Sequence, residues 1–395
     1  MPIPVTYPGV LIEPLPSGVH TIQGVATSIA LFAGWSASGP VDRADRIAGF
    51  ADFRRAYGGH GAHSLLGDAV RQFFDNGGSD AYVLRVAPGP EGTVSGPADA
   101  TFVAALLATF VPGGVVDGID LVNLVCVPGL SDAATIAALQ THCRARRAFL
   151  IVDGDAHATV ADVVASLAGK TGPDAMNSAF FFPWPSVPDP LRHGALRDVP
   201  PCGSVAGVFA RTDAAHGVWK APAGIDAALH GVAGPRIAVN DAQGNSLGTH
   251  AVNCLRSFPG TGTVVWGSRT LAGSDGQASQ WKYVPVRRFA IHLEESLLRG
   301  TRWAVFEPNG EALWVQIRAA VGDFLHGLFL RGAMQGRSPA EAYFVRCDRT
   351  TMTQADIDGG VVHIVVGFAP LKPAEFVIVQ LQQIVVSDAA SLRRR

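Results

Sequence analysis

Asp153 is the residue of this chain best placed to do chemistry. It ends the apolar run Phe149–Asp153, which predicts a buried strand, and α/β enzymes often hold a catalytic carboxylate at such a strand end. The chain continues as Gly154-Asp155-Ala156-His157, so an acid and a histidine follow one another closely. No G-x-S-x-G nucleophile elbow and no cofactor loop accompany them. We therefore interpret Asp153 as a turn carboxylate, and we keep an α/β-fold enzyme that uses the Asp153 region as an alternative.

Two histidines lie on the glycine-rich stretch Gly58-Gly59-His60-Gly61-Ala62-His63. The stretch lacks the Lys-Ser/Thr pair with which a P-loop holds phosphates. His60 and His63 are possible metal ligands, but no third ligand is placed nearby, and zinc sites use at least three protein ligands. The segment predicts a turn before a helix, and we expect neither a metal nor a cofactor.

A pair of adjacent carboxylates, Glu294-Glu295, lies on a predicted helix with Arg287, Arg288 and Arg299. Paired carboxylates suit acid–base catalysis only when a cleft forces them together. The mixture of signs along this helix indicates a solvated or subunit-facing surface instead. We therefore expect no catalytic residues in the chain.

Predicted strands and helices alternate between Val25 and Trp184. This alternation predicts an α/β domain with a mainly parallel sheet. The predicted strands are Val25–Trp35, Ala81–Val86, Leu121–Val127, Phe149–Asp153 and Ala179–Trp184. The predicted helices are Ser64–Asn76, one within Ala100–Val116, one from Asp132 to about Arg147, and Val160–Leu167.

The last third of the chain changes character and predicts longer helices. The helices are Val286–Arg299 and a second from Asn309 to about Arg331, each with apolar residues on one face. The predicted strands are Thr263–Gly267, Arg302–Phe306, Tyr343–Cys347, Val361–Phe368 and Phe376–Val386.

The composition favours a protein whose surface is partly covered. Charged residues make up 16% of the 395 residues, against about 25% in ordinary soluble proteins. This shortage predicts contacts with other subunits, although a glycine- and alanine-rich composition explains it as well. The net charge of −2 gives no attraction for nucleic acid or anionic membranes, so neither is expected as a partner.

Targeting and redox signals are absent from the sequence pattern. The N-terminus has no basic and apolar signal-peptide regions, and the apolar stretch Ala100–Val116 is broken by Pro112-Gly113-Gly114, so we expect no membrane insertion. The five cysteines include no C-x-x-C pair and are odd in number, which predicts reduced thiols.

The stretches Ile3–Glu13 and Phe376–Val386, near the two ends of the chain, are apolar and carry almost no charge. Five prolines in the first sixteen residues exclude a helix and favour extended backbone. An extended segment of this kind exposes unpaired backbone groups unless a sheet edge receives it. The residues that we expect to contact a neighbouring subunit are Ile3, Val5, Tyr7, Val10 and Ile12 at the N-terminus, and Phe376, Ile378, Gln380, Gln382 and Ile384 at the C-terminus.

The stretch Thr263–Arg288, TVVWGSRTLAGSDGQASQWKYVPVRR, resembles the corresponding stretch of contractile tail sheath proteins. These proteins form the outer tubes of contractile bacteriophage tails and of related injection particles. Further stretches that match in the same order are TYPGVLIE, FADFRRAYG, AVRQFFDNGGSDAYVLRV, LVCVPG, RRAFLIVD, TRWAVFEPN and PLKPAEFVIVQLQQI. Together they cover most of the chain.

The resemblance implies a division into two domains and two arms. It implies an exchanged arm at 1–22, an outer α/β domain at 23–250, an inner α+β domain at 251–374 that faces the tube, and a second exchanged arm at 375–395. The strands donated by neighbouring copies would complete the inner domain. The candidates for contact with the tube are Arg318, Asp323, His326 and Arg331 on one long predicted helix.

The resemblance also implies a function without a substrate. Copies would stack in rings around an inner tail tube, with baseplate and tail-terminator proteins at the ends, and would contract to drive the tube through a target envelope. Assembly would take place in the cytoplasm of a bacterial host, and the product would be a virion tail or a released particle. A sheath-like paralogue that caps the particle or its baseplate without contracting is a further alternative.

Overall fold

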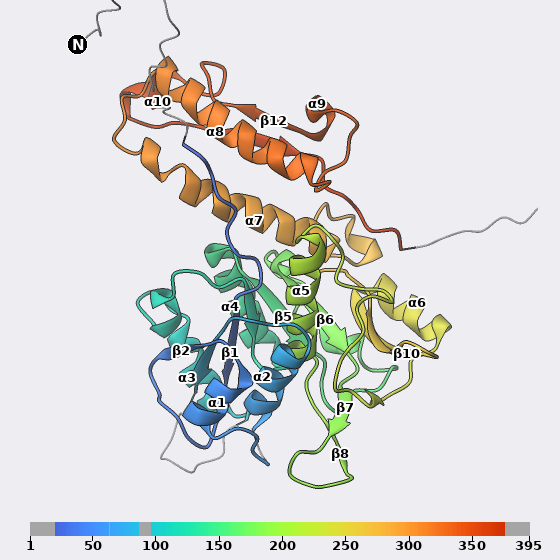
Figure 1. The fold of residues 1–395 in the computed structure, drawn as a ribbon. Helices are drawn as coiled ribbons and strands as arrows, with labels where there is room; N and C mark the ends of the chain where they lie inside the picture. The colour runs from blue at the N-terminus through green and yellow to red at the C-terminus, as the bar shows by residue number, and fades with distance from the viewer. Residues whose placement is uncertain (1–19, 63, 87–95, 376–395) are drawn as a thin grey trace, which may run out of the picture.

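The computed structural model describes residues 20–62, 64–86 and 96–375. A twisted eight-stranded sheet organises the larger part of this chain (Figure 1), in the order β11-β10-β6-β5-β4-β1-β3-β2. Its strands are β1 (Ala30–Gly34), β2 (Ala44–Ile47), β3 (Ala81–Arg85), β4 (Leu124–Cys126), β5 (Phe149–Asp153), β6 (Ser178–Phe182), β10 (Val252–Phe258) and β11 (Gly262–Trp266). The inner pairs are parallel, and the pairs at the two edges, β2–β3 and β10–β11, are antiparallel.

Helices cover both faces of this sheet because its central strands are apolar on both sides. Along β5, Leu150 and Val152 face one core, and Phe149 and Ile151 face the other. The first core is closed by α3 (Ala100–Thr109), α4 (Ala133–Arg146) and α6 (Asp241–Thr249). The second is closed by α1 (Phe50–Tyr57), α2 (Leu65–Asp75) and α5 (Cys202–His216).

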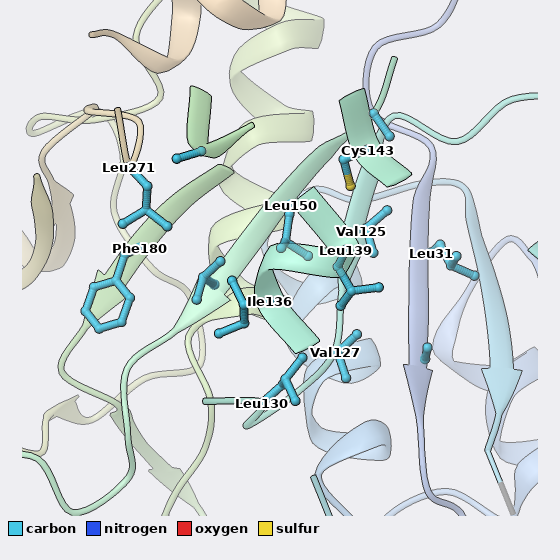
Figure 2. Close-up of a cluster of buried hydrophobic side chains, with 14 of the residues drawn as sticks. Leu31, Val125, Val127, Leu130, Ile136, Leu139, Cys143, Leu150, Phe180 and Leu271 are labelled. Carbon is cyan, nitrogen blue, oxygen red and sulfur yellow. The ribbon is translucent and has the colours of Figure 1, made fainter. Parts of the chain in front are cut away.

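Helix α4 shows how the sequence pattern produces this packing. Asp132 caps the helix as expected, because its carboxylate accepts a hydrogen bond from the Thr135 amide. Ile136, Leu139 and Cys143 then fall on one side of the helix, and Figure 2 shows them directed toward Val125 and Leu150 of the sheet. The α/β prediction is confirmed by this arrangement.

A smaller region with its own core follows in the last third of the chain. It consists of α7 (Val284–Gly300), α8 (Glu311–Leu330), α9 (Pro339–Ala342), β12 (Tyr343–Arg346), α10 (Gln354–Asp358) and β13 (Val365–Phe368). Strands β12 and β13 form a separate antiparallel two-stranded sheet. Helix α7 lies between the regions (Figure 1), since Val284 and Ile291 pack into a core of the large sheet and Phe289 and Leu293 pack against α8.

A third, three-stranded sheet lies at the end of the molecule remote from α8 (Figure 1). It contains β7 (Pro185–Pro188), β8 (Leu196–Asp198) and β9 (Gly234–Pro235), in the order β8-β7-β9. The β7–β8 hairpin projects away from the smaller region.

Two predicted elements are wrong. The segment Arg302–Phe306 is no strand: local bonds such as that from the Val305 amide to the Arg302 carbonyl close a 3-10 turn, η5 (Arg302–Ala304). The helix predicted at Val160–Leu167 is only the turn η2 (Ala165–Leu167), because the Leu167 and Ala168 amides bond carbonyls three residues back instead of four. The other 3-10 turns are η1 (Val115–Gly118), η3 (Ala175–Asn177) and η4 (Asp275–Gln277).

The expected division at 250/251 does not coincide with the edge of the large sheet. Strands β10 and β11 follow residue 250, yet β10 pairs in parallel with β6 through Val252 and Phe180. The reason is that Val252, Cys254 and Leu255 are apolar and fit both cores of the sheet. In the described ranges, no helix has the length and apolar character needed to cross a membrane.

Candidate intersubunit surfaces

Asp153 is a structural link in this fold. Its side chain is buried, with Oδ1 accepting a hydrogen bond from the Cys202 amide at 2.7 Å and Oδ2 accepting one from the Gly129 amide at 2.9 Å. It therefore ties the end of β5 to the loop after β4 and to the start of α5. Burial raises the pKa of this carboxyl to about 7, against the lowering effect of its hydrogen bonds. Asp155 bonds the His157 amide in a separate exposed turn.

The other polar clusters are also internally paired. His60 Nδ1 lies 2.9 Å from Oδ1 of the buried Asp68, whose Oδ2 is 2.7 Å from Arg197 Nη2. His63 lies outside the described residues. Glu294 pairs with Arg287 at 2.9 Å. Among the described residues, no three acidic, histidine or cysteine side chains gather as a possible metal site.

Glu295 likewise forms ion pairs, with Arg299 at 2.6 Å and Arg147 at 3.4 Å. Its carboxylate and that of Glu294 therefore bind arginines on different sides of α7 and do not share a cleft. The helix prediction for this charged segment is confirmed. The expectation of a solvated or subunit-facing surface is wrong, because Arg287, Arg288 and Glu295 are buried and hold α7 against the rest of the fold.

The N-terminal end of the described chain is fixed along α7. The His20 ring stacks on Trp303 with centroids 3.7 Å apart, and Ile22 is buried against Gly300. Further on, the Val25 amide donates to Ser296 Oγ at 3.1 Å. His20 and Ile22 belong to the arm predicted at 1–22, so the last residues of that predicted arm are bound to their own protomer. The predicted contact residues Ile3, Val5, Tyr7, Val10 and Ile12 lie outside the described residues.

The C-terminal end of the described chain is fixed at a different place, by an ion-pair network. Arg269 is buried and donates to both carboxylate oxygens of Glu375, from Nε at 2.5 Å and from Nη2 at 2.7 Å. The Tyr283 hydroxyl donates to the same carboxylate at 3.2 Å. A bidentate arginine–carboxylate pair of this kind has a defined geometry. The predicted contact residues Phe376, Ile378, Gln380, Gln382 and Ile384 lie beyond the described residues.

The two-stranded sheet has unpaired outer edges in the part of the chain that the structure describes. Strands β12 and β13 pair only with each other along Tyr343–Arg346 and Val365–Phe368. The nearest addition is a single bridge between Met334 and Pro370, beyond the end of β13. An isolated two-stranded sheet is marginally stable in water, and its edges are templates for further strands.

The four tube-facing candidates do not share one face of α8. At about 100° per residue, Asp323 and His326 fall on the solvent-exposed stripe of the helix. Arg318 lies to one side of it, where it donates to the Cys347 carbonyl and pairs with Glu311 at 3.2 Å. Arg331 lies to the other side, with its guanidinium 5.4 Å from the Trp219 ring centre.

The exposed stripe of α8 is more apolar than the sequence analysis anticipated. Besides Asp323 and His326 it contains small or apolar side chains at helical spacing: Ala312, Val315, Ala319, Gly327 and Leu330. Leu330 is 71% exposed. The sequence also contains these apolar positions, but the tube-facing candidates were predicted from the charged and polar residues of the helix alone.

Exposed apolar side chains gather in the smaller region. Of the fifteen large apolar residues exposed in the described ranges, nine lie between Leu298 and Leu371. Phe306 is the extreme case, since its side chain is fully exposed. Concentrations of this kind mark surfaces that contact other proteins.

Comparisons with known proteins define a class that fits this geometry, the structural proteins of contractile tails. A model of the phage tail sheath protein central domain matches residues 118–271, and one of the phage tail sheath C-terminal domain matches residues 277–384. The sheath complex of an extracellular contractile injection system, PVC, in its contracted state is 31% identical with a TM-score of 0.78. That match covers 97% of this chain and 99% of the other. The chain belongs to the phage tail sheath family.

Other relatives support the same assignment over different lengths. The contracted helical sheath of the anti-feeding prophage is 29% identical with a TM-score of 0.74, covering 96% of this chain and all of that one. The tail sheath protein of Enterobacteria phage T4 is 28% identical over 41% of this chain. This match of 163 residues spans only 23% of the phage protein.

Proposed function

We propose that this protein is the repeating subunit of a contractile sheath, and that it polymerises by exchanging its terminal arms between neighbours. The observation that carries the proposal is the small sheet β12–β13, whose outer edges are unpaired in the described chain. The parts of the predicted arms 1–22 and 375–395 that lie before His20 and after Glu375 would supply the missing strands to adjacent copies by β-augmentation. Such contacts are head-to-tail, so they build an open helix of stacked rings.

The way each arm is tethered supports this proposal. The chain is held to its own protomer at His20 and Ile22 and again at Glu375. An arm tethered at its base and paired at its tip in a neighbour acts as a hinge that stays linked while rigid bodies move. The large sheet region, with 23–250 and strands β10 and β11, would be the outer domain in this arrangement.

Contraction needs no catalytic site in this proposal. Rotation of subunits about the exchanged arms would bury additional surface between outer domains and release free energy stored in the extended state. A gain of only about 1 kcal/mol per subunit, the scale of one hydrogen bond, becomes large when many copies move together. The baseplate and the tube would hold the extended state, and a terminator protein would close the far end.

The exposed stripe of α8 is the proposed surface toward the inner tube. Small residues such as Ala312 and Ala319 permit close approach, Asp323 supplies a charge, and His326 supplies a polar ring. A shallow contact with few charges suits a surface that must later slide from the tube. Assembly in a bacterial cytoplasm and incorporation into a virion tail or a released particle follow from the same proposal.

A non-contracting cap or baseplate paralogue is the second candidate. It is favoured by the similarity to a chain in the anti-feeding prophage baseplate, which is 28% identical with a TM-score of 0.74. Electron microscopy of the purified protein separates the two roles. Long tubes support the sheath subunit, single rings support the paralogue, and discrete globules contradict both.

Deletion of residues 1–15 tests the exchanged N-terminal arm. We expect the truncated protein to remain folded, because the deletion ends before the anchored segment at His20, and to form no polymers. Circular dichroism measures the fold, and sedimentation with microscopy measures assembly. Polymers like those of the full chain would refute the arm exchange.

Arg269→Met tests the tether of the C-terminal arm. The substitution removes both hydrogen bonds to Glu375 while retaining an apolar stem in the buried site. We expect about a tenfold loss of polymer, because each charge-assisted bond contributes on the order of 1.5–3 kcal/mol. Arg256→Met, which breaks a pair with the exposed Asp241, is the matched control and should assemble normally. Equal assembly of both variants would remove Glu375 as a tether.

A further inference from the structure

The loop between α7 and α8 presents an exposed aromatic side chain, Phe306, which we call the knob. Phe306 is fully exposed, and its neighbour Val305 is 61% exposed. Phe306 also has a φ of 73°, a left-handed conformation that bulky residues rarely adopt and that persists only where the surroundings impose it. Exposure of a phenyl ring on a strained backbone is unfavourable for a loop that contacts only solvent.

Both ends of this loop are held in place. On one side, Trp303 stacks on His20. On the other, the Asn309 side chain donates to the Val361 carbonyl at 3.2 Å and accepts a hydrogen bond from the Trp314 indole at 2.9 Å. Phe306 is therefore presented by fixed neighbours, as the aromatic anchor of an interface must be.

A hollow of about 470 Å³ lies at the opposite end of α7, lined by apolar side chains and by the polar side chains of Asn253, Arg269 and Glu375. Its lining includes Ala223, Gly248, Val252, Trp266 and Tyr283, and Trp266 is 40% exposed there. An aromatic ring needs on the order of 150 Å³, so the hollow accommodates Phe306 together with an adjacent side chain of its loop.

The knob and the hollow cannot meet within one protomer. Tyr283 precedes the first residue of α7, and Phe306 follows the last, so the 17-residue helix separates them by about 25 Å. A knob at one flank and a hollow at the other give a head-to-tail contact that repeats without closing on itself.

The place where the described chain ends indicates that a neighbour lies beside the hollow. Pro373, Ala374 and Glu375 form part of its rim, and residues 376–395 continue from this point. If the C-terminal arm reaches another copy, it starts on this flank. That copy then lies where its own α7–α8 loop can approach the rim.

We propose that Phe306 of one subunit inserts into the hollow beside Trp266 of the next subunit. This inference rests on the proposed sheath function and specifies a contact within it. The knob sets the lateral register between subunits, while the exchanged arms keep them linked. The occupant is a second copy of this chain.

Cysteine cross-linking of mixed subunits tests the contact directly. One preparation carries Phe306→Cys and the other Gly248→Cys, where an added Cβ meets no atom within 4 Å. The five native cysteines are buried, so they contribute little background. After oxidation of mixed polymers we expect disulfide-linked dimers, and none when either preparation is oxidised alone. Absence of the mixed dimer from well-formed polymers overturns the inference and leaves the sheath function intact.

Phe306→Ser measures what the contact contributes. We expect the critical concentration for polymerisation to rise by about tenfold or more, the factor associated with burial of one large apolar side chain. Leu196→Ser, at an exposed position on β8 outside the lining of the hollow, should leave it unchanged. An unchanged value for Phe306→Ser contradicts the knob. A wild-type chain that never polymerises contradicts the sheath function itself.

Discussion

The eight-stranded sheet and the two-stranded sheet differ in how their edges are protected. At one edge of the large sheet, β2 is short and charged, with Arg46 paired to Asp80 at 2.5 Å. At the other edge, the Leu229 amide donates to Thr263 at 2.7 Å, so that residues beside β11 cover its backbone. Strands β12 and β13 have no comparable cover in the described chain.

This difference indicates which region has surface left to bury on assembly. The large region buries its strands on both faces and closes its own edges, so it behaves as a finished unit. The smaller region leaves edges and apolar side chains without partners among the described residues. We propose that a subunit built in this way is stable through one region and polymerises through the other.

We expect the largest effect on stability from a substitution at the contact between the two regions. Arg288 of α7 donates to Asp213 of α5 at 2.6 and 2.9 Å, and both side chains are almost completely buried. Arg288→Met leaves the Asp213 charge unpaired, so we expect the free energy of unfolding to fall by about 3–5 kcal/mol. Chemical denaturation measures this change.

Two further variants sharpen the result. Arg55→Met removes an exposed pair with Asp52 and should change the stability by less than about 0.5 kcal/mol. The double variant Arg288→Met/Asp213→Leu replaces both charges with apolar groups and should recover most of the loss. A small effect of Arg288→Met alone would mean that the regions are not coupled through this pair.

Asp153→Asn is expected to have an intermediate effect on the finished region. An asparagine side chain has one acceptor oxygen, so either the Cys202 or the Gly129 amide loses its partner. We expect a loss of about 1–3 kcal/mol near pH 5 with normal polymers. Asp155→Asn, in the neighbouring exposed turn, is the control. An unaltered stability would show that Asp153 does not link β5 to α5.

The pH dependence of this variant follows from the raised pKa. Burial raises the pKa of Asp153 to about 7, whereas an unfolded aspartate titrates near about 3.9. The folded protein therefore keeps a proton that the unfolded chain loses, and this contribution is full below about pH 4 and is lost as the pH rises through 7. The stability difference between wild type and Asp153→Asn should shrink between pH 5 and pH 8. A constant difference would contradict the raised pKa.

The region of the eight-stranded sheet was also the part of the fold that could be predicted best from the sequence. Alternating strands and helices, with apolar residues on both sides of Phe149–Asp153, are local signals that periodicity reveals. The extension of the sheet by β10 was missed because its pairing with β6 is set by long-range packing. The turn at Arg302–Ala304 was missed because its apolar residues resemble a strand until the left-handed Phe306 is known.

The candidate surfaces were less accessible from the sequence. The predicted arms are based on the apolar stretches Ile3–Glu13 and Phe376–Val386, and their exchange stays a prediction. The Arg269–Glu375 pair was not predicted, because it joins residues that are distant in sequence and has no local pattern. Helix α8 was predicted well, whereas its exposed stripe depends on which side packs against β12. Residues Arg318 and Arg331 were grouped with Asp323 by charge, although the helix separates them around its axis.

We expect the smallest change in assembly from charge reversal on α8, which tests the proposed tube surface of the smaller region. We expect Arg318→Glu together with Asp323→Arg to leave polymers intact and to disturb assembly guided by the inner tube. Because Asp323 is on the exposed stripe and Arg318 pairs with Glu311, the effect should follow Asp323→Arg alone. Arg318→Glu alone should alter only stability, by about 1 kcal/mol or less. Electron microscopy of particles assembled with the tube protein measures length and regularity, and normal full-length particles from the double variant would refute the proposed tube surface.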